Sequence, residues 1–286
     1  TKVWVDAKGR PVRIEKVEND ISHQLIEELM LLANEATARE LRVHRQPVVY
    51  RVHESPDEER LLEFREFALL HGVRPGDLTN RAELQKLLES VRGQTFEHAV
   101  KIALLKSLKR ARYHETPLGH YGLSKSDYLH FTSPIRRYAD LIAHRAIAKH
   151  LGLVKSGPDS RALPAIAEHI SNTERSAADA EREAVKLKKL EYFQARISER
   201  TGGVFTARII DVRNFGIFVE LPDFLITGLI HVSALDNDFY VFDAARAQFQ
   251  GRRSRKVFRI GQTLDVIVSR VDLFKQQIDF RPAEGD

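Results

Sequence analysis

Apolar residues recur at helical spacing over residues 19–43. One stripe consists of Ile21, Leu25, Leu29, Leu32 and Ala36, and a second one of Ile26, Met30 and Ala33. A spacing of three and four residues places each set on one face of a helix. Because two stripes lie side by side, we expect one long helix that is buried over much of its girth.

Other segments carry the start and end signals of strands and helices. A strand, a turn at Gly9 and a second strand are predicted over residues 2–14. Asn80 and Glu83 have capping-box spacing, and Pro164 opens a long helical stretch. The predicted helices cover residues 57–70, 80–91, 95–112 and 164–200.

The hydrophobic period changes from helical to alternating after Gly203. Phe205, Ala207 and Ile209 alternate with the side chains between them, and four further short runs follow at residues 214–221, 225–232, 263–271 and 276–281. Five short strands in so few residues fit a small closed barrel of the OB type. The sequence therefore predicts an α/β, mostly helical domain over residues 1–200 and an all-β five-stranded barrel over residues 201–286.

Composition narrows the class of protein. Hydrophobic residues make up 43% and charged residues 30%, which excludes a disordered chain. The absence of cysteine excludes disulfides, thiolate zinc sites and a cysteine nucleophile, and it fits a reducing compartment such as the cytoplasm. No apolar run is long enough for a membrane span, so no membrane partner is expected. The formal net charge is only +5, so a polyanion would have to meet clustered charge.

The chain opens at Thr1, within a predicted strand and without a methionine. We therefore expect it to be the C-terminal portion of a longer protein.

The segment around Ser133 and Pro134 is the strongest candidate for anion binding. Proline favours the first position of a helix, which would make Ser133 the N-cap and leave free N–H groups at the helix start. Arg136 and Arg137 would then lie in the first turn, where cations oppose the helix dipole unless an anion is bound. In the alternative interpretation, Arg136 simply pairs with Asp140 one turn later. The residues alone leave both interpretations open.

Carboxylates offer weaker candidates. Glu27 and Glu28 interrupt an apolar helix segment, so one of them could point inward and accept a sugar hydroxyl or orient a cation. A solvated pair is the alternative and the more common case. Glu181, with Asp179 and Glu183, is expected to lie on a solvated helix face.

The predicted barrel carries a candidate platform for bases. Alternation places Ile217 inside and Phe218 outside, a bulge at Gly216 could turn Phe215 outward, and His231 lies outside on the next strand. Exposed aromatic rings stack on bases, although packing at the edge of the core is an alternative. Five cations between residues 252 and 259 could follow a phosphate backbone or form a solvated loop.

Three motifs together resemble the ribonuclease II and ribonuclease R exoribonucleases, the RNB family. They are HYGLSKSDYLHFTSPIRRYADLIAHR at residues 120–145, IEELMLLANEATA at 26–38 and ERSAADAERE at 174–183. The tail is similar to the S1 barrel of the same proteins. The resemblance covers essentially the whole chain and implies hydrolysis of single-stranded RNA from its 3′ end to nucleoside 5′-monophosphates.

The resemblance also implies roles for particular residues. Arg136 would contact the phosphates at the reacting end, Glu27 would help to hold the terminal nucleotide, and Glu181 would lie near the site. Ser133 and Arg137, in the same segment as Arg136, are expected to bind RNA. In the barrel, the residues that match the RNA-binding face are Phe215, Phe218, His231 and Asp272, with Lys275 as a further RNA-binding residue. Gln276 departs from the family, which usually has a basic residue there.

The resemblance implies a Mg²⁺ cofactor whose aspartate ligands precede the region that corresponds to this chain. We therefore expect an upstream segment or a partner chain to complete the active site. Two other functions remain open: a non-catalytic RNA-binding subunit or pseudo-enzyme, and a DNA-binding or translation-related module with the same barrel. The second does not explain the HFTSPIRRY segment.

Overall fold

The computed structural model describes residues 1–17, 20–70, 72–94, 96–199, 202–235, 238–244 and 246–283. The chain packs into two units. The helical unit comprises residues 18–60 and 107–180, and the barrel unit comprises residues 1–17, 61–106 and 181–286. The long helix α6 (Leu163–Ser198) contributes its first half to the helical unit and its second half to the barrel unit.

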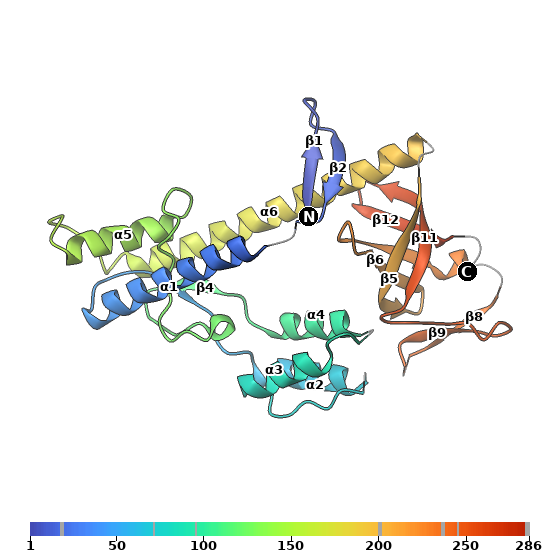
Figure 1. Ribbon diagram of the computed structural model, residues 1–286, viewed down its shortest axis with the longest axis horizontal. Helices are drawn as coiled ribbons and strands as arrows, with labels where there is room; N and C mark the ends of the chain where they lie inside the picture. The colour runs from blue at the N-terminus through green and yellow to red at the C-terminus, as the bar shows by residue number, and fades with distance from the viewer. Residues whose placement is uncertain are drawn as a thin grey trace. The chain divides into compact units, whose positions relative to one another are not determined.

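The helical unit is built on long helices and a few short elements. These are α1 (Ile21–Val43), β3 (Tyr50–Val52), β4 (Arg112–His114), the short 3₁₀ helix η1 (Tyr121–Leu123), α5 (Tyr138–His150) and the first half of α6. Strands β3 and β4 pair in antiparallel fashion, and α1 packs beside α5 (Figure 1). The core contains Leu41, Val49, Leu129, Ala143 and Ala167, all nearly inaccessible to solvent. This packing fixes α1, α5 and the chain between them as one framework.

Helix α1 confirms the predicted helix but not its burial. Asp20 caps its start by accepting a hydrogen bond from the backbone N–H of His23 at 2.9 Å, while Asn19 lies outside the described residues. The buried residues are Asn34, Ala38 and Leu41, all in the second half. In the first half, Ile21 is 82% exposed and Leu25 is 60% exposed. The apolar stripes were visible in the sequence, but burial needs a partner surface, which periodicity does not identify.

The N-terminal parts of the barrel unit are a hairpin and three helices. Strands β1 (Lys2–Val5) and β2 (Pro11–Glu15) pair across a turn in which Gly9 has a φ of 74°, as the sequence predicted. The helices are α2 (Glu58–Leu70), α3 (Arg81–Ser90) and α4 (Glu97–Ser107). Asn80 caps α3 through the N–H of Ala82 at 2.9 Å. Helix α4 ends five residues before the predicted end, and Thr95, where the predicted helix begins, lies outside the described residues.

The predicted barrel is confirmed. Strands β5 (Val204–Arg213), β6 (Gly216–Leu221), β7 (Ile226–His231), β11 (Thr263–Asp272) and β12 (Gln277–Pro282) close in the order β11-β12-β7-β6-β5. Only the β12–β7 pair is parallel among the pairs the structure describes in this barrel. Ile217, Val219 and Ile230 are fully buried inside, and Leu190 and Phe193 of α6 join the same core.

A second small sheet interrupts the barrel sequence and was not predicted. Strands β8 (Tyr240–Asp243), β9 (Gln248–Gly251) and β10 (Val257–Arg259) pair in the order β10-β9-β8. The boundary predicted at residues 200/201 falls between the end of α6 and the start of β5, but Arg200 and Thr201 themselves lie outside the described residues. None of the described helices is long and apolar enough to cross a membrane.

Candidate nucleic-acid interface

The turn that carries the two arginines ends before α5 begins, which corrects the prediction. Helix α5 starts at Tyr138 with Arg137 as its N-cap, so Pro134 is not the first helical residue and Ser133 is not the cap. Instead, the carbonyl of Ser133 accepts the backbone N–H groups of Arg136 and Arg137 at 3.3 and 3.2 Å. The backbone N–H of Ser133 donates to Asp140 at 2.8 Å. The Asp140 carboxylate, in the first turn of α5, therefore binds the backbone of this segment. It does so in place of the N-cap that was predicted at Ser133.

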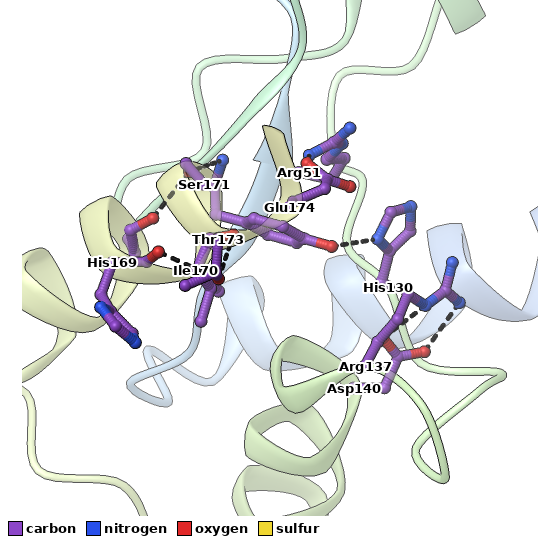
Figure 2. A network of polar contacts seen from close by, with 11 residues as sticks. Arg51, His130, Arg137, Asp140, His169, Ile170, Ser171, Thr173 and Glu174 are labelled. Carbon is purple, nitrogen blue, oxygen red and sulfur yellow. Dashed lines mark hydrogen bonds and ion pairs between the residues drawn. The ribbon is translucent and has the colours of Figure 1, made fainter. Parts of the chain in front are cut away.

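Asp140 also decides which arginine is paired. Arg137 donates to its two oxygens from Nε and from a terminal guanidinium nitrogen, each at 2.8 Å, and the Asp140 side chain is fully buried (Figure 2). Arg136 is exposed, and its guanidinium makes no ion pair or hydrogen bond with any side chain that the structure describes. The alternative interpretation thus assigned the pair to the wrong arginine. The charge of Arg137 is neutralised within the protein, whereas that of Arg136 is available to a ligand.

Asn34 fixes α1 against this segment. Its amide nitrogen donates to the Tyr128 hydroxyl at 3.1 Å, and its amide oxygen accepts the backbone N–H of Phe131 at 2.9 Å. The residue is 3% exposed. The sequence analysis overlooked it, although a short amide within the apolar run of IEELMLLANEATA was a usable signal, because a buried amide requires partners.

A pocket of about 540 Å³ lies between α1 and this segment. Its walls include Ile26, Glu27, Met30, Asn34, Tyr128 and Arg137. The structure thus brings Glu27 and Arg137, two of the predicted site residues, to one pocket. Glu27 and Glu28 are both exposed, so neither carboxylate points into a protein core. The arrangement offers the Glu27 carboxylate and an apolar wall to a ligand, while Asn34 and Arg137 are engaged within the protein.

A second network anchors the other side of the segment. Arg51 on β3 donates to Glu174 on α6 at 2.6 Å, and its guanidinium lies 4.7 Å from the ring centroid of Tyr113. The Tyr113 hydroxyl contacts Nδ1 of His130 at 2.9 Å. Figure 2 shows Arg51 meeting Glu174, and His130 beside the Arg137–Asp140 pair. Glu174 opens the motif ERSAADAERE, but the sequence analysis weighed only the later acids of that motif.

Burial holds the aromatic and imidazole groups of this network neutral. It lowers the pKa of His130 to about 3, with Arg137 and Arg51 adding to the shift, and it lowers the pKa of His120 to about 4. Burial also raises the pKa of the Tyr113 hydroxyl to about 12, reinforced by the charge of Glu174. At neutral pH the positive charge here therefore comes from the arginines.

Glu181 lies exposed on the second half of α6, in the barrel unit, whereas Glu27 and Arg136 belong to the helical unit. Its role near the site stays a prediction.

The described residues contain one candidate cluster of metal ligands. Among them, the one group of three or more histidine or carboxylate side chains close enough to hold an ion is Glu40, His44 and His150. Two of these ligands are imidazoles, whereas Mg²⁺ prefers oxygen ligands.

The barrel presents the predicted aromatic face. Phe215 is 45% exposed, Phe218 is partly buried, and their ring centroids lie 5.9 Å apart in an edge-to-face arrangement. Exposed His231 is next to them because it pairs with Gly216 across β6 and β7. Gly216 is needed for this close approach: a Cβ there would meet the Ile230 carbonyl oxygen at 2.4 Å. The predicted bulge at Gly216 is wrong, since the irregularity lies on β5 between residues 209 and 211.

Strand register extends this face around the barrel. Phe218 pairs with Leu229, Leu229 with Asp279, and Asp279 with Arg270. Residues paired across neighbouring strands share one face, and strands about 4.8 Å apart make this row about 14 Å long. Arg270 is exposed at its end. The sequence analysis missed Arg270 because only the pairing of distant strands brings it into this row.

Asp272 and Lys275 lie at the end of the row. Asp272 accepts the backbone N–H of Lys275 at 2.9 Å and a guanidinium N–H of Arg270 at 3.3 Å. Lys275 is exposed in the turn between β11 and β12, and Gln276 there has a φ of 51°. The carboxylate of Asp272 therefore shapes the turn and orients Arg270.

The cations predicted to cluster at residues 252–259 belong to a segment whose backbone binds the Asp238 side chain. That carboxylate accepts the backbone N–H groups of Arg253 and Ser254 at 3.0 and 2.7 Å, and these bonds, with the Ser254 hydroxyl, hold its pKa well below the usual range. Arg252 stacks 4.7 Å from the ring centroid of Phe239.

Comparison with known proteins identifies both parts of the chain. Residues 1–152 match the RNB domain family, and residues 199–281 match the S1 RNA binding domain family. Ribonuclease R of Thermotoga maritima is 40% identical over 295 aligned residues, which cover 100% of this chain and 41% of that protein. The curated relatives compared are thus more than twice as long as the chain.

Solved structures agree with the family match. Mycoplasma genitalium RNase R in complex with ribose methylated single-stranded RNA superposes with a TM-score of 0.83 at 28% identity, covering 99% of this chain and 45% of that one. Yeast Ssd1, a pseudonuclease, shares the fold with a TM-score of 0.67 at 23% identity, over 81% of this chain and 29% of its own. The chain therefore belongs to the RNB family, to which ribonuclease R belongs, and carries an S1 RNA-binding domain behind its RNB portion.

Proposed function

We propose that this chain takes part in the 3′-to-5′ hydrolysis of single-stranded RNA to nucleoside 5′-monophosphates, by holding the phosphates at the reacting end and guiding the strand. The observation that carries the proposal is the exposed, unpaired guanidinium of Arg136 next to the buried Arg137–Asp140 pair. The buried pair fixes the turn, and no described side chain neutralises the exposed guanidinium of Arg136 beside it.

Arg136 suits a phosphate for physical reasons. A guanidinium donates two parallel hydrogen bonds to a phosphate and keeps its charge at any physiological pH. Fixed donors that meet charge developing on a scissile phosphate lower the barrier to its cleavage. In this proposal Arg136 meets that charge, while Ser133 and Arg137 shape the turn that presents it.

Glu27 would receive the terminal nucleotide in the pocket between α1 and the arginine segment. A carboxylate accepts hydrogen bonds from sugar hydroxyls, and the apolar wall of Ile26 and Met30 fits the face of a base or a sugar. Glu181 is proposed to lie near the same site in the complete enzyme.

The ligands of Mg²⁺ are proposed to lie outside the described residues. The one candidate cluster found among them carries two imidazoles, and we propose that ligands in an upstream segment or a partner chain hold the ion.

The barrel would deliver the strand. Phe215, Phe218 and His231 form a stacking surface, and Arg270 and Lys275 add positive charge farther along the same part of the barrel. Stacking on aromatic rings tolerates any base, which suits processive degradation.

A non-catalytic RNA-binding protein is the second candidate. The fold is compatible with it, since yeast Ssd1, a pseudonuclease, shares this fold. In such a protein Arg136 would hold RNA without cleavage.

One assay separates the two candidates. Single-stranded RNA labelled at its 5′ end is incubated with Mg²⁺ and either this chain or the longest product of its gene. The proposed enzyme shortens the labelled RNA stepwise from its 3′ end and releases mononucleotides. Binding without any cleavage by either protein supports the non-catalytic candidate, and internal cuts would contradict both.

A further inference from the structure

Glu40, His44 and His150 form a cluster that the proposed RNA chemistry does not use. Glu40 and His44 lie one turn apart at the end of α1, and His150 is the last residue of α5. Their potential ligand atoms all lie within 4.8 Å of one another. We propose that this cluster is a binding site for a divalent transition-metal ion and that Zn²⁺ is the ion it prefers.

The distances around the Glu40 carboxylate suit one small ion. Its Oε1 atom lies 2.9 Å from Nε2 of His150 and 3.2 Å from Nδ1 of His44. Ligands about 2.0 Å from a tetrahedral zinc are about 3.3 Å apart, so small rotations would let the three side chains share an ion. In this step Nδ1 of His44 would exchange its hydrogen bond to the backbone carbonyl of Glu40, at 3.0 Å, for the metal. The His44 and His150 rings are already adjacent, with centroids 4.4 Å apart.

The ligand chemistry selects the class of metal. Two imidazoles and one carboxylate are typical ligands of zinc and are poor ligands for Mg²⁺. Three protein ligands leave a fourth position for water. The side chains of Glu40 and His44 are 49% and 46% exposed, so an ion can enter from solvent and the ligands can adjust.

The helix ends add electrostatic support that is independent of the side chains. Helix α1 ends at Val43 with His44 as its C-cap, and α5 ends at His150, so the negative ends of two helix dipoles meet at the cluster. Neighbouring cations are engaged elsewhere: Arg42 pairs with Asp127 at 2.6 Å, and Lys149 donates to the carbonyl of Lys155 at 2.6 Å. A bound cation would therefore face little competition for Glu40.

The ion would act as a clamp between the two helices that bear the RNA site. Helix α1 carries Glu27 and Asn34, and the first turn of α5 carries Asp140. Binding to the folded protein alone stabilises it in proportion to the logarithm of ligand concentration. Zinc would thus stabilise this framework without taking part in the chemistry.

The test measures Zn²⁺ binding to the whole chain after treatment with a chelator. The variants are His44→Ala, His150→Ala and Glu40→Gln, and the matched control is His169→Ala, which removes an exposed histidine of α6 in the same unit. We expect one Zn²⁺ per chain, weakened at least about tenfold by each of the three variants and unchanged by the control. A large excess of Mg²⁺ should not displace it.

Two further readouts keep the test decisive. Zn²⁺ should raise the Tm of the native chain by a few degrees and leave the Tm of the His44→Ala protein unchanged, even if His150→Ala does not fold. Co²⁺ should give the visible absorption of a tetrahedral site in the native chain and lose it in Glu40→Gln. Absence of binding, or equal binding by native protein, cluster variants and control, would overturn the proposal.

Discussion

Asp140 is the residue on which the arrangement of the site depends. Its buried carboxylate accepts one backbone N–H and two guanidinium N–H groups, so it defines the turn at Ser133 and fixes Arg137 in the same step. A buried charge is tolerated only with such partners. The neighbouring Arg136 keeps its charge because the one buried carboxylate beside it is already saturated.

Replacing this carboxylate tests its structural role. The Asp140→Ala change leaves Arg137 and the Ser133 N–H without their acceptor, so the free energy of unfolding should fall by about 3 kcal/mol or more. Glu168→Ala, at an exposed position of α6, is the control and should change it by less than about 0.5 kcal/mol. Chemical denaturation of the three proteins measures both values. A loss below about 1 kcal/mol for Asp140→Ala would show that the pair does not hold the turn.

At this scale the sequence predicted the important segment but not its pairing. Spacing of one helical turn favoured Arg136 as the partner of Asp140, yet that rule applies only within a helix, and Arg136 precedes the helix. Asn34 and Glu174 were overlooked because their partners, Tyr128 and Arg51, lie far away in the sequence.

The elements show which patterns carry local information. The five barrel strands were predicted because alternation and turn residues act over a few neighbours. The small β8–β10 sheet was missed, since its strands are three or four residues long and their pairing is not encoded in a period. For α1 the apolar period correctly predicted a helix, but the predicted burial of its first half was wrong. Exposure depends on what packs against the helix.

The β6–β7 face supports a prediction about RNA binding. Phe218→Ala removes one ring of the Phe215–Phe218 pair, so the affinity for single-stranded RNA should weaken by about 1 to 3 kcal/mol. Fluorescence anisotropy with labelled RNA at a fixed salt concentration measures the change. Val204→Ala, an exposed apolar position on β5, is the matched control and should bind as the native chain does. Identical titration curves for Phe218→Ala and native protein would remove the stacking surface from the account.

For the molecule as a whole, the family could be predicted from three motifs, and the comparisons confirm it. The motifs are informative because a proline turn and two arginines occur in the same chain as a distant helix that carries carboxylates, in a fixed order along the sequence. They do not reveal which contacts hold the site together, since these contacts join segments of α1, β3, α5 and α6 that are far apart in the chain.

Partly buried histidines give the stability of the chain a pH dependence. The pKa values of about 3 for His130 and about 4 for His120 lie below the ordinary value near 6.5, so in this window the unfolded chain binds protons that the native chain does not. The free energy of unfolding should therefore fall as the pH drops from about 6.5 towards 4. Urea denaturation at a series of pH values measures this slope.

A variant tests whether the histidines cause this pH dependence of the free energy of unfolding. His130→Gln removes one of the two groups, so its free energy of unfolding should depend less steeply on pH between about 6.5 and 5, where few carboxylates titrate. A native protein with constant stability across that interval would contradict the buried, neutral state of both rings.

We propose that the guanidinium of Arg136, which pairs with no described side chain, acts on the phosphate at the reacting end. The most direct test compares native protein, Arg136→Ala and the control Arg145→Ala, an exposed arginine of α5, in a preparation that hydrolyses RNA. Turnover of single-stranded RNA at saturation and the Kd for the same RNA are measured side by side. We expect Arg136→Ala to lower turnover at least about 100-fold with a much smaller change in Kd, and Arg145→Ala to change neither. Equal turnover by Arg136→Ala and native protein would contradict the claim.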